Sequence, residues 1–284
     1  MGLFDSKVIV ITGGSLGIGL EIAKACASEG ASVILAARDQ ANLQKALIDL
    51  SQISNKEHQC YSLNVGKHEE VGAFGRWCSE RFNKIDGLVN CAGVYGPIGR
   101  SHQVDMGNFR EAVETNFLGT VYMCHAFIPL FRSSRRKKIV NYSGGGAATP
   151  FPNFSAYATS KVAIVRFTEN LSIELSDEGF DVNCVAPGFV ATRLHQETLQ
   201  AGEECATKSF YEFTKKQMES GGVPAQKAAK LTVFLLSSES DGITGRFISA
   251  PWDPWQDKEF QNRLRADRDF ATLRRIDEKT FFKK

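Results

Sequence analysis

The feature that most constrains the fold is an apolar run near the start of the chain that leads directly into a glycine-rich segment. Residues 8–11 read Val-Ile-Val-Ile, and residues 13–19 read Gly-Gly-Ser-Leu-Gly-Ile-Gly. A helical pattern follows over residues 20–27 and ends near Gly30. A strand, a glycine turn and a helix in this order predict the first unit of a parallel α/β sheet.

Strand-like and helix-like segments go on alternating along the rest of the chain. Further strands are expected at 32–36, 59–63, 87–90, 138–142, 181–185 and 246–249, and helices at 43–50, 71–82, 109–131, 156–175 and 225–236. This alternation is typical of a Rossmann fold, a doubly wound parallel sheet of about seven strands with helices on both faces. We expect one dinucleotide-binding domain over residues 1–284, because 43% hydrophobic residues suffice for a single packed core.

Two segments interrupt the alternation. Residues 189–222 form a long polar insertion, which we interpret as a lid, since long insertions in compact domains are usually functional or disordered. Residues 251–284 form a C-terminal extension that begins with Trp252 and Trp255 and then becomes charged. It is equally consistent with an arm docked over the site, an arm docked on a partner subunit, and a solvated tail.

Composition argues against several classes of partner. The chain has 34 basic and 32 acidic residues, a net charge of +2, and so gives no reason to expect nucleic acid or an anionic membrane. The longest mostly apolar run, 117–131, contains His125 and Pro129 and is too short to span a bilayer. Seven scattered cysteines without a CxxC pair indicate reduced thiols and therefore a cytoplasmic protein. No metal site is expected.

The glycine-rich segment is suited to binding a dinucleotide. Glycines allow a backbone to approach a diphosphate closely, and the following helix directs its N-terminal amides at the anion. The expected contacts are Gly13, Ser15, Leu16, Gly17, Ile18 and Gly19.

The residue after the second strand bears on which dinucleotide binds. An acidic side chain there would bind a ribose 2′-hydroxyl, but the chain has Arg38, whose guanidinium pairs with a 2′-phosphate. The next residue, Asp39, is expected to cap a helix. NADP(H) is therefore favoured, and NAD(H) stays open as the alternative.

Tyr157 and Lys161 are separated by one turn of a predicted helix. The pKa of a free tyrosine is about 10, and a cation one turn away lowers it. A phenol tuned in this way donates a proton to a carbonyl oxygen or accepts one from an alcohol. We therefore expect Tyr157 to be a general acid/base that Lys161 assists.

Taken in order, these motifs resemble those of the short-chain dehydrogenase/reductase family of the single-domain type, over the chain to about Ala250. Residues 88–93 read Leu-Val-Asn-Cys-Ala-Gly and resemble the family's NNAG segment, with Cys91 in place of the second asparagine; we expect Cys91 to alter only loop packing. Asn64-Val65 replaces the family's Asp-Val beside the adenine. The positions at which the resemblance implies further cofactor contacts are Asn64, Val65, Asn90, Ala92, Gly93, Tyr157, Lys161, Pro187, Gly188, Val190 and Thr192.

The resemblance also implies an activity. It implies an NAD(P)-dependent oxidoreductase that interconverts a carbonyl and a secondary alcohol on a small-molecule substrate. Asn116 would hold a water that relays protons, and Lys161 would bind the nicotinamide ribose. The family's assembly implies a homodimer or homotetramer.

One catalytic position departs from the family pattern. The serine that binds the substrate oxygen falls at Gly144, with Ser143 beside it. In order of preference, Ser143 serves after a one-residue shift; a glycine amide, a water or a substrate group replaces the hydroxyl; or turnover is lost. Losing one such donor costs about 10²–10³ in rate.

Two other functions remain open on the sequence. One is a dinucleotide-binding sensor or scaffold with weakened catalysis, and the other is a sugar epimerase that uses transient oxidation. His195, with Arg193 nearby, is a candidate contact for a polar or anionic substrate, and a solvated lid face is the alternative.

Overall fold

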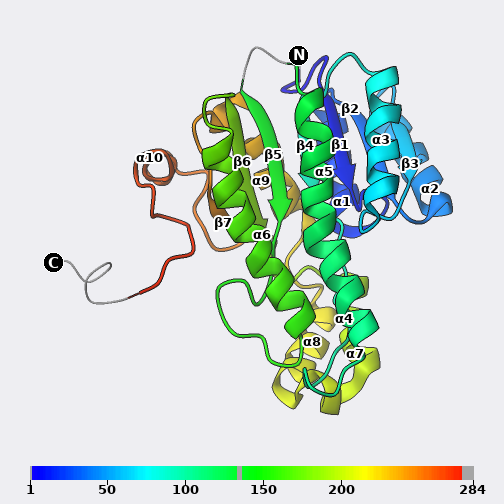
Figure 1. Ribbon diagram of the computed structural model, residues 1–284, viewed down its shortest axis with the longest axis vertical. Coiled ribbons are helices and arrows are strands. Elements are labelled where there is room, and N and C mark those ends of the chain that lie inside the picture. The colour runs from blue at the N-terminus through cyan, green and yellow to red at the C-terminus, as the bar shows by residue number, and fades with distance from the viewer. Residues whose placement is uncertain (1, 133–135, 277–284) are drawn as a thin grey trace.

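The computed structural model describes residues 2–132 and 136–276, which form a seven-stranded parallel sheet with helices on both faces (Figure 1). The strands are β1 (Val8–Thr12), β2 (Ser32–Ala37), β3 (Gln59–Ser62), β4 (Gly87–Asn90), β5 (Lys137–Tyr142), β6 (Phe180–Ala186) and β7 (Phe247–Ser249). Their order across the sheet is β3-β2-β1-β4-β5-β6-β7, and every neighbouring pair is parallel. The doubly wound Rossmann arrangement expected from the sequence is confirmed.

The helices cover the sheet in two layers (Figure 1). They are α1 (Gly17–Ser28), α2 (Gln40–Ile53), α3 (His68–Arg81), α4 (Met106–Val113), α5 (Gly119–Phe127), α6 (Ser155–Glu174), α7 (Arg193–Ala206), α8 (Lys208–Ser220), α9 (Ala225–Leu236) and α10 (Lys258–Ala266). Because side chains along a strand point alternately to opposite faces, one strand supplies both cores. Ile9 and Ile11 pack with α1, α2 and α9, whereas Val10 packs with α3 and α5.

The predicted helix over 109–131 is divided in the structure. A π-helical turn, Glu114–Leu118, separates α4 from α5, and a 3₁₀ turn, Ile128–Leu130, containing Pro129, ends the segment. π-helical turns interrupt helices mostly where a functional residue must be placed. This one carries Asn116.

The insertion over 189–222, which the sequence analysis interprets as a lid, contains two helices. Its two ends are held together, because Val190 pairs with Gly222 and the Val223 amide donates to the Phe189 carbonyl at 2.7 Å. Between them α7 and α8 lie beyond the carboxyl ends of the strands (Figure 1). The chain turns from one helix to the other at Thr207, which has φ +68°.

The described part of the C-terminal extension lies against the β7 edge of the sheet, and residues 277–284 fall outside the described residues (Figure 1). The Phe247 amide donates to the Ala271 carbonyl at 2.7 Å, so the edge strand gains a partner. Trp255 is buried in the core, whereas Trp252 is exposed. None of the described helices combines the length and apolar character that crossing a bilayer requires.

Candidate active site

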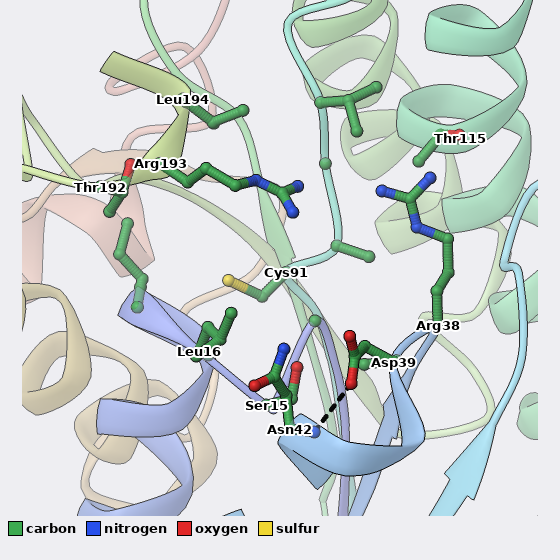
Figure 2. A pocket seen from close by; sticks show the side chains of 18 of the residues that line it. Ser15, Leu16, Arg38, Asp39, Asn42, Cys91, Thr115, Thr192, Arg193 and Leu194 are labelled. Atoms are coloured by element: carbon green, nitrogen blue, oxygen red, sulfur yellow. Dashed lines mark hydrogen bonds between the residues drawn. The ribbon is translucent and has the colours of Figure 1, made fainter. Parts of the chain in front are cut away.

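A cavity of about 490 Å³ opens at the carboxyl ends of the strands (Figure 2). It lies where the strand order reverses, between β1 and β4, which is where ligands bind in open α/β sheets. The predicted cofactor residues that line it are Gly13, Ser15, Leu16, Gly17, Ile18, Gly19, Arg38, Asn64, Val65, Ala92, Gly93 and Thr192. The fold thus gathers segments that are far apart in the chain around one cavity.

The glycine turn is shaped for close approach to an anion. Gly13 has φ +66°, and a Cβ there would lie 2.9 Å from the Ala92 Cα. A Cβ at Gly19 would overlap the Gly13 carbonyl. No side chain caps α1 at Leu16, and its first turn holds no acidic residue, so its N-terminal amides can bind a diphosphate. The residues present therefore fit a dinucleotide.

Arg38 and Asp39, at the end of β2, have different roles. The Asp39 carboxylate accepts the Asn42 amide at 2.8 Å, so the predicted helix cap is confirmed. Arg38 lines the cavity, and its guanidinium is 3.9 Å from Glu111 with both side chains about half exposed. An exposed ion pair of this kind is weak. The guanidinium therefore remains available to an incoming phosphate.

Six of the predicted cofactor residues do not line the cavity: Asn90, Tyr157, Lys161, Pro187, Gly188 and Val190. The amide group of Asn90 is buried and donates to the Asn141 carbonyl oxygen at 2.9 Å, tying β4 to β5. Gly188 has φ +77°, and a Cβ there would lie 2.7 Å from Pro251. Asn90, Gly188 and Val190 thus hold backbone segments in place, and their direct contact with the cofactor stays a prediction.

Tyr157 and Lys161 are buried on the same side of α6. The Lys161 ammonium donates to the Tyr142 carbonyl at 2.9 Å and lies 5.5 Å from the centre of the Tyr157 ring. A Cβ at Gly93, which lines the cavity, would lie 3.4 Å from the same nitrogen. The pair therefore stands directly behind the cavity wall.

Burial shifts the ionisation of both groups. It raises the pKa of Tyr157 above its usual value and lowers the pKa of Lys161 to about 8. Desolvation of the phenolate is the main cause of the rise at Tyr157, and the neighbouring Cys91 adds to it, whereas the assistance expected from Lys161 stays a prediction. At neutral pH the Tyr157 hydroxyl carries its proton.

The predicted oxyanion donor is engaged elsewhere. The Ser143 hydroxyl is buried and donates to the Lys161 main-chain carbonyl at 2.9 Å, so a one-residue shift does not present it to the cavity. A Cβ at Gly144 would overlap the Tyr157 hydroxyl. The phenol itself occupies the space that a serine side chain would need.

Asn116 is fully buried and its side chain makes three hydrogen bonds. Its carbonyl oxygen accepts the Val94 amide at 2.8 Å, and its NH₂ donates to the Val94 carbonyl and the Ser160 hydroxyl, both at 2.9 Å. It thereby connects the loop after β4 to α6. Both N–H donors are therefore used, whereas the side-chain oxygen can still accept one further hydrogen bond.

An aromatic wall surrounds Tyr157 on the side away from the glycine turn. The Tyr95 ring stands perpendicular to it with centres 4.8 Å apart, and Phe151 lies at 6.4 Å. Phe210 of α8 packs on Phe151 at 4.7 Å. His195 of α7 is buried beside this wall, and its Nδ1 has no hydrogen-bond partner among the described residues.

Several cavity residues escaped the sequence analysis: Ala37, Asn42, Thr115, Leu194 and Gln196. Leu194 and Gln196 follow Thr192 closely, so a helix starting at 193 would have indicated them. Thr115 lies in the π-helical turn, which the sequence pattern did not reveal. Cys91 also lines the cavity with its sulfur directed inward (Figure 2), so its effect goes beyond loop packing.

Comparison with known proteins agrees with this geometry. The family model described as short chain dehydrogenase matches residues 7–203. A 3-oxoacyl-[acyl-carrier-protein] reductase from Chlamydia trachomatis is 31% identical over 87% of this chain and 97% of its own. An 11-beta-hydroxysteroid dehydrogenase from Sesamum indicum is 34% identical over 69% of this chain but only 56% of its own length.

Solved structures share the fold over most of the chain. A levodione reductase is 25% identical with a TM-score of 0.79, covering 89% of this chain and 98% of that one. A short chain dehydrogenase from Salmonella enterica serovar Typhi is 25% identical with a TM-score of 0.77, covering 88% and 98%. With a cavity at the switch point and a family match over more than half its residues, the chain belongs to the short-chain dehydrogenase/reductase family and is an oxidoreductase.

Proposed function

We propose that the protein binds NADP(H) in this cavity and interconverts a carbonyl and a secondary alcohol, with Tyr157 as general acid and base. The observation that carries the proposal is the placement of the Lys161 ammonium directly behind Gly93 of the cavity wall, 5.5 Å from the centre of the Tyr157 ring. A protonated phenol at that point is positioned to donate to a carbonyl oxygen. The named relatives include enzymes of carbonyl reduction and alcohol oxidation.

Each part of the cavity has a separate role in holding the cofactor. The first-turn amides of α1 bind the diphosphate, Arg38 binds the 2′-phosphate, and Lys161 binds the nicotinamide ribose. When bound, the nicotinamide supplies a hydride to the substrate carbon or accepts one from it. NADP(H) is preferred over NAD(H) because the end of β2 offers a guanidinium and the neighbouring carboxylate is committed to its helix cap.

The substrate is a small molecule with an apolar body. Tyr95 and Phe151 pack on the Tyr157 ring, Phe210 packs on Phe151, and aromatic faces bind apolar rings and chains. We propose that α7 and α8 act as a lid over this substrate. The paired residues Val190 and Gly222 form its base, so that the segment between them moves as a unit.

Replacing Tyr157 by phenylalanine tests the catalytic role. Tyr157→Phe should abolish turnover across a panel of ketones and alcohols while NADPH binding stays within about twofold of wild type, because the lost hydroxyl contributes to chemistry rather than to binding. Tyr122→Phe, on α5, is the matched control and should keep full turnover. Unchanged turnover in Tyr157→Phe would refute the assignment.

A second candidate, a dinucleotide-binding sensor, is favoured by Gly144 alone. No serine side chain can stand there beside the phenol, so one oxyanion donor of the family pattern is missing. The same panel separates the candidates. A wild-type protein that binds NADPH tightly but turns over no substrate would select the sensor.

Assembly and location are part of the proposal. We propose a homodimer or homotetramer in the cytoplasm, since α6 leaves Val162 and Ile173 exposed and all seven cysteines are free. Light scattering after gel filtration measures the subunit number. A monomer at micromolar concentration would contradict this part of the proposal.

A further inference from the structure

Arg193 extends into the cofactor cavity from the first position of α7. It lines the cavity, and its guanidinium points toward the middle, opposite that of Arg38 (Figure 2). Its only ion pair among the described residues is with Glu197, at 3.5 Å, and the side chain is 59% exposed. The guanidinium is therefore loosely held and can reach a ligand.

The position of Arg193 is unfavourable for the helix that carries it. The N-terminus of a helix is its positive end, where a cation is destabilising. The first turn of α7 holds no acidic residue, and the side chain of Thr192 does not cap it. The amides of this turn and the guanidinium thus add their positive potentials at the edge of the cavity.

The start of α7 lies beside the start of α1 at the edge of the cavity. A Cβ at Gly17 would lie 3.5 Å from the Thr192 methyl group, so the residue after Thr192 enters close to the glycine turn. Arg38 enters from the opposite side, beyond the end of β2 (Figure 2). The two arginines can therefore contact different parts of an extended anionic ligand.

We propose that Arg193, which reaches into the cavity from the start of α7, binds the diphosphate of the dinucleotide together with the α1 amides, and so fastens α7 over the bound cofactor. The inference rests on the proposed cofactor and adds a contact made by the lid itself. Arg193 would act equally on phosphorylated and unphosphorylated dinucleotides, whereas Arg38 would act only on the former. Charge-assisted hydrogen bonds to phosphate oxygens are the interaction in both cases.

Glu197 provides a second consequence of the same contact. Its carboxylate pairs with Arg193, and burial raises its pKa. A diphosphate arriving at Arg193 competes with this carboxylate and is repelled by it. Removing the charge of Glu197 should therefore strengthen diphosphate binding.

Two fragments of the cofactor separate the roles of the arginines. ADP-ribose carries the diphosphate without a 2′-phosphate, and adenosine 2′-phosphate carries the reverse. By titration calorimetry, Arg193→Gln should weaken ADP-ribose about tenfold and leave adenosine 2′-phosphate unchanged, since one charge-assisted hydrogen bond to the diphosphate is lost. Arg38→Gln should show the opposite pattern, and Glu197→Gln should tighten ADP-ribose about twofold to threefold.

Matched variants guard against unfolding. Arg110 forms an i,i+4 pair with Glu114 at the same 3.5 Å but does not line the cavity, so Arg110→Gln should change neither affinity. Arg193→Lys keeps the charge and should lose less affinity for ADP-ribose than Arg193→Gln. In wild type, ADP-ribose should slow amide exchange in the first turns of α7, and Arg193→Gln should remove this protection.

The outcomes distinguish this inference from the proposed function. Wild-type binding of ADP-ribose that Arg193→Gln leaves intact would overturn the diphosphate contact while the cofactor stands. An effect of Arg193→Gln on adenosine 2′-phosphate alone would also overturn it. A wild-type protein that binds neither fragment nor NADPH would overturn the proposed cofactor as well.

Discussion

The Tyr157 hydroxyl limits which residue can stand at position 144. A Cβ at Gly144 would overlap the Tyr157 oxygen, while a Cβ at the adjacent Gly145 would meet Phe151 only at 3.8 Å. Tyr95 and Phe151 pack on the Tyr157 ring, so the ring cannot swing away without disturbing them. A tyrosine in this position therefore requires a glycine at position 144.

Gly144→Ala, or Gly144→Ser, should impair the protein even though serine is the residue that the family pattern expects. We predict a loss of at least tenfold in turnover and a free energy of unfolding lower by about 1–3 kcal/mol, because the added atom overpacks the site. Gly145→Ala is the control and should be close to wild type in both measurements. A gain of activity in Gly144→Ser would show that the phenol readily moves.

Burial of His195 makes the stability of the protein sensitive to acid. Its pKa is lowered from 6.5 to about 4, mainly by desolvation. Between these values the unfolded chain binds more protons than the folded chain, so the free energy of unfolding falls as the pH decreases, by about 3 kcal/mol in full. Urea unfolding from pH 7 to 4 should show a smaller fall in His195→Gln, and the same fall as wild type in the exposed His102→Gln.

At the scale of elements, one arginine anchors the C-terminal extension. Buried Arg246, just before β7, donates to the carbonyls of Leu264 and Arg268 at 2.8 Å and of Phe270 at 3.2 Å. These carbonyls belong to the end of α10 and the segment after it. The guanidinium of Arg246 thus attaches the extension to the sheet through hydrogen bonds to main-chain carbonyls of the extension, in addition to side-chain packing.

Arg246→Lys should release the extension, because an ammonium cannot span the same three carbonyls. We predict that the free energy of unfolding falls by about 3 kcal/mol and that limited proteolysis cleaves beyond Pro254 before the rest of the chain. Arg265 also bonds to two carbonyls but is exposed, so Arg265→Lys should cost less than about 1 kcal/mol. Equal losses in the two variants would contradict the anchoring role.

At the scale of the whole molecule, cysteines in both cores report on global packing. Cys26 lies in the core on the α1 side of the sheet, and Cys78 and Cys124 lie in the core on the α3 side. All seven cysteines are free, and Cys205 is the exposed one. Reactivity of the buried thiols therefore requires opening of the fold.

A thiol reagent should modify one cysteine rapidly in the native protein, and Cys205→Ser should abolish that fast phase. Burial raises the pKa of Cys91 to about 12, which keeps it unreactive although it lines the cavity. The four buried thiols, Cys26, Cys78, Cys124 and Cys184, should react only in denaturant, as counted by mass spectrometry. Rapid labelling of Cys26 or Cys124 would contradict the packing described.

The strands were predictable to within one or two residues because each is a short apolar run bounded by turn residues. The glycine turn, Arg38 and the Tyr157–Lys161 pair were also found, since each is a local pattern with a chemical meaning. The lid was not predicted as two helices. Its residues are mostly polar and its buried side is defined only by contact with the aromatic wall around Tyr157.

The sequence by itself determined the parallel sheet, the glycine turn and the residues that could carry redox chemistry, because hydrophobic period and glycine position act over a few neighbouring residues. Only the tertiary structure decided what each side chain does. Ser143 turns to a carbonyl of α6, Asn90 ties two strands together, and Arg193 reaches the cavity. These outcomes depend on which distant atoms share a space, and the order of residues along the chain does not contain those distances.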